Sequence, residues 1–342
     1  MRKLLNTLYV TNPESYLARE GENVLVRVDD NTVFRIPCHN LEAIVYFGYP
    51  GASPSLLGLC AERGITVSFL TEHGRFLARV EGPQSGNVLL RRRQYRLADE
   101  ENQAPLLAKY FIAAKIINSR AVLLRGRRDH PEIVEDNFEQ AIVFMGKMAK
   151  KVFESNNLGD VRGIEGETAQ RYFEQIDHLI LEDKSEFFMK GRSRRPPLDK
   201  FNALLSLFYT LLVHECRSAL ETVGLDPAVG FLHRDRPGRP SLALDLMEEL
   251  RAYLGDRMAL SLINRKQICK DDFVVNPNGA VYLKKDARKN VLAAWQKRKQ
   301  EEIVHPYLNE KILVGLLPYT QALLLARFLR GDIDAYPAFV WK

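Results

Sequence analysis

The spacing of hydrophobic residues changes along this 342-residue chain, and the change falls near residue 98. Before it, apolar residues alternate with polar ones at a period of about two, as in strands; after it, they recur about every 3.6 residues, as in amphipathic helices. A chain of this length can bury two cores. The pattern predicts an α+β multidomain protein, with a small, mainly β N-terminal domain over 1–98 and a larger all-α domain over 99–342.

Turn and capping residues place the individual elements. The first domain is expected to contain hairpins over 24–36 and 65–80, a strand over 41–47, and a helix over 54–63 between Ser53 and Gly64. The segment Gly82–Gly86 precedes the expected boundary. Helices are expected over 103–125, 132–155, 161–181, 198–222, 242–254, 257–268, 287–303 and 308–330, with a short strand pair at 273–275 and 281–283 among them.

The positive charge of the chain is clustered. The formal net charge is only +6, but Lys and Arg gather in five short segments, near residues 91–96, 125–128, 190–195, 284–289 and 297–299. Any one such cluster could simply keep a surface helix solvated, but five together favour a polyanionic partner such as nucleic acid.

Other features exclude several protein classes. The four cysteines form no C-x-x-C pair, which argues against a zinc ribbon and favours reduced thiols in a cytoplasmic protein. Polar residues interrupt the first apolar run too early for a signal peptide. No segment approaches the roughly 20 apolar residues that span a bilayer.

A candidate metal site lies between residues 233 and 250. His233 stands in a loop rich in Arg, Pro and Gly, and the apolar helix that follows carries Asp245, Glu248 and Glu249. Carboxylates at i, i+3 and i+4 share one helix face, so we expect the three to converge. An imidazole with carboxylates suits a divalent cation such as Mg²⁺ or Mn²⁺. The flanking arginines, which favour a phosphate ligand, are Arg234, Arg236 and Arg239.

Glu165 is a second candidate. It lies between Gly163 and Gly166 at the start of a helical segment, and the two glycines would let backbone or a ligand approach closely. Glu165 could instead be an acid in the first helical turn, favoured by the helix dipole. Tyr172 and Tyr209 are expected near the site, because the helices that carry them adjoin it.

Several motifs, in order along nearly the whole chain, resemble those of the CRISPR-associated spacer-acquisition integrases, the Cas1 family. Gly163–Gly166 resembles the first motif of the family, and His233 with Ser241–Glu249 resembles the second and third. Further matches are Gly191–Ser206, Gly224–Pro227 and the tail Tyr336–Trp341, while Ser85–Arg92 is similar to the subtype I-C branch.

The resemblance implies an N-terminal β domain that dimerises and a helical catalytic domain. It places the metal ligands on Glu165, His233 and Glu248, with Asp245 as a further acid of the catalytic site; many relatives have Asp where this chain has Glu248. It also implies a partnership with the small protein Cas2, which bridges two dimers into a heterohexameric adaptation complex. The substrates it implies are double-stranded and branched DNA.

The resemblance implies a metal-dependent DNA endonuclease and integrase. The implied reaction joins the 3′-hydroxyl end of a foreign DNA fragment to a phosphodiester of the CRISPR repeat by direct transesterification, using Mg²⁺ or Mn²⁺ as Lewis acid. Activity should fall once the pH is low enough to protonate His233. Residues expected to hold DNA phosphates are Arg192, Arg194, Arg195, Arg234, Arg236 and Arg239. Two other functions remain open: a non-enzymatic DNA-binding scaffold, and a metal-dependent hydrolase of small phosphoesters.

Overall fold

The computed structural model describes residues 7–72, 76–80, 82 and 88–341, which form two compact units. The first unit comprises Met1–Ser85, Leu283–Glu302 and Leu313–Leu316, and the second comprises Gly86–Tyr282, Ile303–Ile312 and Leu317–Lys342. The first of these divisions falls between residues 85 and 86 and not near residue 98, as the sequence predicted. The reason is that the helix Val88–Asp99 belongs to the second unit. The turn expected at 73–75 and the segment 83–87 lie outside the described residues.

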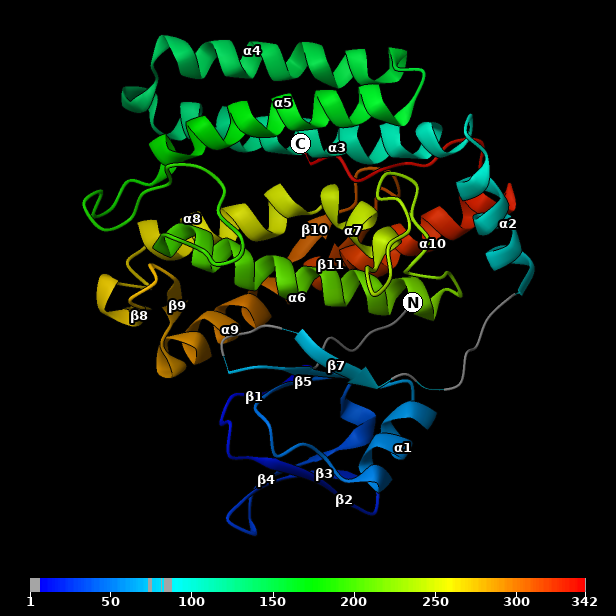
Figure 1. Cartoon of the computed structure of the whole chain (residues 1–342), viewed down its shortest axis with the longest axis vertical. Coiled ribbons are helices and arrows are strands. Elements are labelled where there is room, and N and C mark those ends of the chain that lie inside the picture. The colour runs from blue at the N-terminus through cyan, green and yellow to red at the C-terminus, as the bar shows by residue number, and fades with distance from the viewer. Residues whose placement is uncertain (1–6, 73–75, 81, 83–87, 342) are drawn as a thin grey trace. The chain divides into compact units, whose positions relative to one another are not determined.

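The first unit holds two small sheets (Figure 1). The four-stranded sheet has the order β1-β5-β6-β7; its first three strands are parallel and β7 is antiparallel to β6. The three-stranded sheet β2-β3-β4 is antiparallel throughout. The bounds are β1 (Thr7–Val10), β2 (Tyr16–Glu20), β3 (Asn23–Val28), β4 (Asn31–Pro37), β5 (Ala43–Phe47), β6 (Thr66–Leu70) and β7 (Phe76–Val80), with helices α1 (Pro54–Glu62) and α9 (Lys285–Lys299) in the same unit.

Local sequence explains these elements well. Asp29 and Asp30 both have positive φ, as a tight hairpin turn requires, and they connect the predicted strands β3 and β4. Ser53 caps α1 by accepting a hydrogen bond from the Leu56 N–H. The core of the unit is formed by alternate strand residues and one face of α1, among them Leu17, Val24, Ile44, Tyr46, Leu56, Cys60 and Val67. Both predicted hairpins, the strand and the helix are confirmed.

The second unit consists mainly of helices (Figure 1). Helices α3, α4 and α5 pack side by side, and α6 packs against α7 and α10. The bounds are α2 (Val88–Asp99), α3 (Ala104–Asp129), α4 (Asp136–Lys151), α5 (Leu158–Ile176), α6 (Lys200–Thr222), α7 (Ser241–Glu248), the π-helix η5 (Arg251–Asp256), α8 (Arg257–Asn264) and α10 (Leu317–Arg330). The predicted strand pair is confirmed as β8 (Phe273–Val275) and β9 (Val281–Leu283).

Short elements complete the described chain. The strands β10 (Glu302–Val304) and β11 (Lys311–Leu313) pair with each other. The 3₁₀ turns are η1 (Cys38–Asn40), η2 (Pro131–Ile133), η3 (Val152–Glu154), η4 (Asp177–Leu179), η6 (Lys270–Asp272) and η7 (Val314–Leu316). None of the helices described is both long and apolar enough to cross a membrane.

Two sequence predictions of helix content are wrong. Helix α2 was not expected, because its arginines obscure the spacing of Leu90, Gln94 and Leu97, which are buried on one face. The helix expected over 308–330 begins only at Leu317. Before it, Asn309 has positive φ and the His305 N–H donates to the Glu310 carbonyl, so the chain turns back and β11 pairs with β10.

Candidate active site

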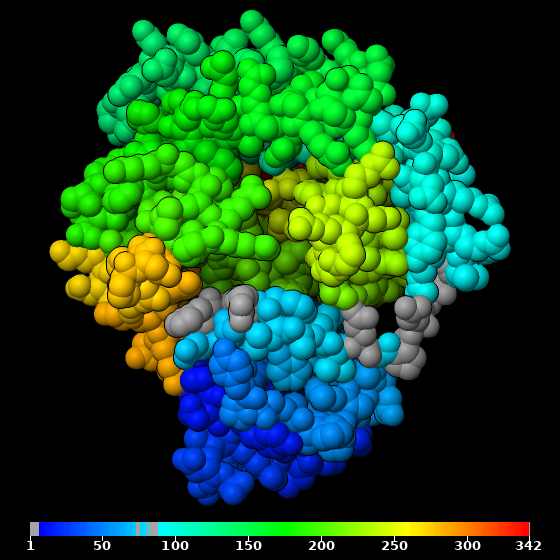
Figure 2. All heavy atoms as spheres, viewed as in Figure 1, coloured from blue at the N-terminus to red at the C-terminus, as the bar shows by residue number. Residues whose placement is uncertain are grey.

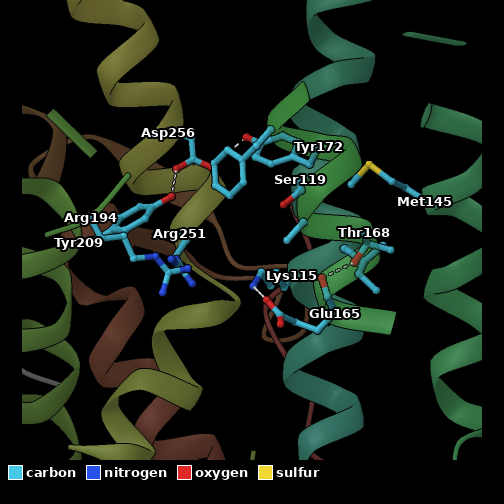
Figure 3. A pocket seen from close by; sticks show the side chains of 13 residues that line it. Lys115, Ser119, Met145, Glu165, Thr168, Tyr172, Arg194, Tyr209, Arg251 and Asp256 are labelled. Atoms are coloured by element: carbon cyan, nitrogen blue, oxygen red, sulfur yellow. Dashed lines mark hydrogen bonds and ion pairs between the residues drawn. The ribbon is translucent and has the colours of Figure 1, made fainter. Parts of the chain in front are cut away.

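Lys115 joins two of the candidate ligands. Its ammonium, on α3, contacts Glu165 Oε1 on α5 (Figure 3). It also lies 2.8 Å from Glu248 Oε2 at the end of α7. The Lys115 side chain is 12% exposed, whereas Glu165 is 30% exposed and Glu248 only 5%. Residues far apart in the sequence thus bring the carboxylates of Glu165 and Glu248 to one lysine ammonium.

Arg251 gives Glu248 a second positive partner. One guanidinium nitrogen of Arg251 lies 2.6 and 2.8 Å from the two Glu248 oxygens. Burial raises the pKa of the Glu248 carboxyl, but the attraction of Arg251 and Lys115 outweighs burial and holds that pKa well below its ordinary value. Glu248 is therefore an ionised carboxylate despite its burial.

His233 is held by Asp245. The imidazole Nδ1 lies 2.6 Å from Asp245 Oδ1, which also accepts the His233 backbone N–H at 3.0 Å. The other oxygen, Oδ2, accepts the N–H groups of Phe231 and Leu232 at 2.6 and 2.9 Å. An ionised carboxylate only accepts, so Nδ1 carries the proton and Nε2 presents its lone pair. Within the described residues Nε2 has no hydrogen-bond partner, so it is free to bind a cation.

The loop before His233 fits tightly over Asp245. A Cβ at Gly230 would lie 2.8 Å from Asp245 Oδ2 and 2.9 Å from the His233 carbonyl oxygen, which is too close for a side chain. Nearby, the Arg162 guanidinium donates to the Leu232 carbonyl at 2.5 Å. Because Arg162 lies one helical turn before Glu165, this bond ties the helix of Glu165 to the loop of His233.

The expectation that Asp245, Glu248 and Glu249 converge is wrong. Asp245 accepts hydrogen bonds from the 231–233 loop, and Glu248 forms ion pairs with Lys115 and Arg251. Glu249 is buried and binds the C-terminal tail. Successive residues on a helix are about 100° apart, so Glu248 and Glu249 cannot face the same ligand even though each lies near Asp245 in projection. Glu249 is thereby excluded as a ligand at this site, and Asp245 acts on His233.

Glu249 fastens the tail. Its fully buried carboxylate accepts the Tyr336 hydroxyl at 2.5 Å and the Phe339 N–H at 2.6 Å, with the Gln321 amide at 3.2 Å. Asn118 on α3 completes the joint, because its side chain binds the Glu249 carbonyl, the Phe339 carbonyl and the Trp341 N–H. These hydrogen bonds attach the C-terminal tail to the end of α7, the helix that carries Glu248.

Burial should make Glu249 a source of pH dependence. Burial raises its pKa to about 7 from an ordinary value near 4.5, despite three donors that lower it. An acid whose pKa is raised in the folded state stabilises that state fully below its unfolded pKa, so the free energy of unfolding should fall by about 3 kcal/mol as pH rises from about 4.5 to about 7. Urea unfolding of wild type and Glu249→Gln across this range measures it. A constant difference between the two proteins would contradict the prediction.

A buried network lies beside Arg251. The hydroxyls of Tyr172 and Tyr209 both donate to Asp256, at 2.9 and 2.5 Å (Figure 3). Burial raises the pKa of the Asp256 carboxyl, opposed by these hydrogen bonds and by Arg251. Arg251 stacks on the Tyr209 ring at 4.3 Å. Tyr172 and Tyr209 line the same pocket as Glu165, but both side chains are buried. The π-helix η5 supplies both Arg251 and Asp256.

A pocket opens at this network. Its lining includes Lys115, Glu165, Arg194, Arg251 and Asp256. The surface of the helical unit is hollowed between the green segment and the yellow-green segment near residue 230 (Figure 2). The charged side chains of Lys115, Arg194 and Arg251 line this pocket together with Glu165.

The predicted DNA-contacting arginines divide into two groups. Arg192 is half-buried, donates to Asn202 Oδ1 at 2.7 Å and stacks on Tyr209, so it holds its own loop. Arg239 donates to Ser241 Oγ and to the Arg234 carbonyl. The remaining four are exposed, and their side chains have no hydrogen bond or ion pair within the described residues: Arg194, Arg195, Arg234 and Arg236.

The donor set fits a hard or borderline divalent cation. Glu165 and Glu248 already share one positive group, and the Asp245–His233 pair is the carboxylate–imidazole arrangement that orients metal-binding histidines. As the side chains stand, no three His, Cys, Asp or Glu residues in the described part of the chain are arranged to hold a metal. Lys115 and Arg251 occupy the oxygens of Glu248 instead.

Sequence reasoning missed Lys115, Arg251 and Asp256. The only available signal was the placement of single charged residues among apolar helical neighbours, where an ion must find a partner. For Arg251, the spacing of three residues after Glu248 was a visible clue. Nothing local identified the partner of Lys115, because its two carboxylates lie 50 and 133 residues away, from 115 to 165 and from 115 to 248.

Comparisons with known proteins identify the family of this chain. A family model for CRISPR-associated protein Cas1 matches residues 8–297. A CRISPR-associated endonuclease Cas1 from Chlorobaculum tepidum is 54% identical over 343 residues and covers 100% of both chains. The chain belongs to the Cas1 family.

Solved structures support the fold of this Cas1-family chain. A casposase bound to its integration product superposes with a TM-score of 0.85 at 22% identity, covering 98% of this chain and 94% of that one. A Cas6-RT-Cas1–Cas2 complex gives a TM-score of 0.81 at 26% identity, covering 98% of this chain and 36% of that one. The predicted fold class is confirmed, as is the prediction of a CRISPR-associated endonuclease. Family membership also supports a metal-dependent enzyme.

Proposed function

We propose that this chain joins the 3′-hydroxyl end of a DNA fragment to a phosphodiester of the CRISPR repeat at a site formed by Glu165, His233 and Glu248. Mg²⁺ or Mn²⁺ bound there would act as Lewis acid on the phosphate and lower the pKa of the attacking hydroxyl. The observation that carries the proposal is the pair of carboxylates, from α5 and α7, that share one cation. Asp245 belongs to the site as the residue that orients His233.

Each residue has a defined task in this reaction. Glu165 and Glu248 supply anionic oxygens, and His233 supplies neutral Nε2 because Asp245 fixes the proton on Nδ1. In the transfer, one bond forms between the 3′ oxygen and phosphorus and the existing bond to the leaving 3′ oxygen breaks, so no covalent protein intermediate is needed. Burial raises the pKa of the Tyr209 phenol well above its ordinary value, which makes a tyrosinate nucleophile unfavourable.

DNA would approach along the exposed arginines. Arg194, Arg195, Arg234 and Arg236 flank the site on two loops of the helical unit, and their guanidinium groups have no protein partner among the described residues. Such groups suit phosphate contacts that position DNA without reading its sequence. Arg192 and Arg239 would shape these loops.

The exposed arginines lead to a salt-dependence prediction. Replacing Arg194 and Arg234 together by alanine should reduce the slope of log binding constant against log salt by about two, because the double variant neutralises two fewer phosphates and so displaces about two fewer counterions from DNA. Fluorescence anisotropy with duplex and branched DNA at several salt concentrations measures the slope. Arg265→Ala, on an exposed position outside this group, is the matched control, and an unchanged slope in the double variant would remove these arginines from the interface.

The proposed assembly follows from the family. We propose a homodimer that uses the N-terminal β unit and binds Cas2, with two dimers in a heterohexamer. The match to a chain in a complex that contains Cas2 supports the Cas2 partnership. Exposed apolar side chains on β4, Val33 and Phe34, suit burial in a dimer. We also propose subtype I-C, on the resemblance of Ser85–Arg92.

A strand-transfer assay tests the reaction. With a branched DNA substrate, wild type should form joined products in Mg²⁺ or Mn²⁺ and none in excess chelator, and restoring the metal should restore them. Salt-sensitive DNA binding with no metal-dependent product would support the scaffold alternative instead. Turnover of a small soluble phosphoester without any strand transfer would support the hydrolase alternative.

A further inference from the structure

Lys115 contacts both of the carboxylates to which the proposed function assigns the metal. Its ammonium contacts Glu165 Oε1 and lies 2.8 Å from Glu248 Oε2, and its side chain is 12% exposed. In the described residues Glu165 has no other ion-pair partner. Within the described residues Glu165 on α5 is thus neutralised by Lys115 alone, whereas Glu248 on α7 is also paired with Arg251.

A divalent cation and this ammonium compete for the same oxygens. A metal ion of this class binds carboxylate oxygens at about 2.0 to 2.2 Å, so the lysine nitrogen cannot remain between the same two atoms. Lysine can leave, because its single charge sits on a flexible four-carbon stem. Arg251 differs, because it touches only Glu248 of the two and its guanidinium is stacked on the Tyr209 ring.

We propose that Lys115 is an exchangeable internal counter-ion: it holds Glu165 and Glu248 together in the metal-free protein and is displaced when the divalent cation binds. This inference rests on the proposed function. The metal can bind only those molecules in which Lys115 has moved away. The apparent dissociation constant for the metal is therefore the intrinsic one divided by the fraction of molecules in that state. In exchange, it prevents repulsion between the two carboxylates before the metal arrives.

Removing the lysine charge should have two opposite effects. Lys115→Met keeps most of the aliphatic stem and removes the ammonium. In chelator this variant should melt at a lower temperature than wild type, because Glu165 loses its partner. In Mn²⁺ it should bind the ion about tenfold more tightly and gain more in melting temperature than wild type, because no resident cation has to be displaced.

The experiment is a Mn²⁺ titration of the full chain, with free Mn²⁺ measured by its electron paramagnetic resonance signal. The variants are Lys115→Met, Lys115→Gln and Lys115→Arg, of which only the last keeps the charge and should bind Mn²⁺ no more tightly than wild type. Lys109→Met is the matched control, because Lys109 lies on the same helix and its ammonium contacts the Phe153 carbonyl at 3.2 Å instead of the site. If the Met variant does not fold, the Gln and Arg variants carry the comparison.

The outcomes separate this inference from the proposed function. Equal or weaker Mn²⁺ binding by the charge-free variants would show that Lys115 does not compete with the metal, and would overturn the inference. Glu165→Gln and Glu248→Gln report on the site itself. If these two leave Mn²⁺ binding unchanged, the proposed metal site is wrong; if they weaken it while Lys115→Met does not strengthen it, only the role of Lys115 fails.

Discussion

Glu165→Ala, His233→Ala and Glu248→Ala should each lower the rate of strand transfer at least about a thousandfold, since loss of the Lewis acid removes several kcal/mol of transition-state stabilisation. The three residues come from α5, from the loop before α7 and from the end of α7, and they supply two carboxylates and one imidazole. The measurement is single-turnover joining of a labelled 3′ end to a branched substrate in Mn²⁺. Metal affinity, from the same preparations, should fall in parallel.

The matched control for this set is Glu167→Ala. Glu167 lies two residues after Glu165 on α5, but its carboxylate is exposed and lies 3.9 Å from Arg171. Its loss should leave joining and Mn²⁺ binding unchanged. DNA binding by the three site variants should persist, because the exposed arginines are untouched. A site variant that is folded and joins DNA at the wild-type rate would remove that residue from the site.

Asp245→Asn is expected to be the second most damaging substitution. Each oxygen of Asp245 accepts two donors: Oδ1 from the backbone and ring of His233, and Oδ2 from the N–H groups of Phe231 and Leu232. Whichever way an asparagine amide turns, its NH₂ group faces two donors. We expect a loss of about 3 kcal/mol in the free energy of unfolding, because buried donors are left unpaired. Metal affinity and joining rate should fall roughly 10- to 100-fold, as for other groups that orient a histidine ligand.

A purely structural role for Asp245 would predict only the loss of stability. Nitrogen chemical shifts of the His233 ring distinguish the two, because a neutral amide at position 245 holds the proton on Nδ1 less strongly than the carboxylate does, or offers it no acceptor at all. Asp235→Asn is the control, since it makes the same change on an exposed position two residues from His233. Unchanged His233 shifts in a folded Asp245→Asn protein would contradict the positioning role.

Much of the secondary structure could be predicted because its causes are local. The turn at Asp29 and Asp30 and the cap at Ser53 act within a few residues, so the sequence predicted them correctly. Helix α2 was missed because its four arginines obscured the spacing of its buried residues. The segment before Leu317 was misjudged because a single positive-φ residue, Asn309, redirected an otherwise helical pattern.

The candidate site, too, was predictable only in part from the sequence. Glu165, His233 and Glu248 were predicted from motifs whose spacing reflects helices and loops. The direction of each acid on α7 was not, because direction depends on what packs around the helix. Tyr336 and Phe339 of the tail bind the carboxylate of Glu249, whereas Lys115 and Arg251 bind that of Glu248.

The sequence by itself determined most of the order of the elements, which follows from periodicity and turn chemistry. It also indicated the family, through the resemblance of its ordered motifs, and predicted the residues of the candidate site. Only the tertiary structure decided which acid faces which partner. The packing of α3 against α5 and α7 places Lys115 between two carboxylates, and a charge taken from water must find an opposite charge wherever the fold provides one. That requirement acts through space, so no local pattern records it.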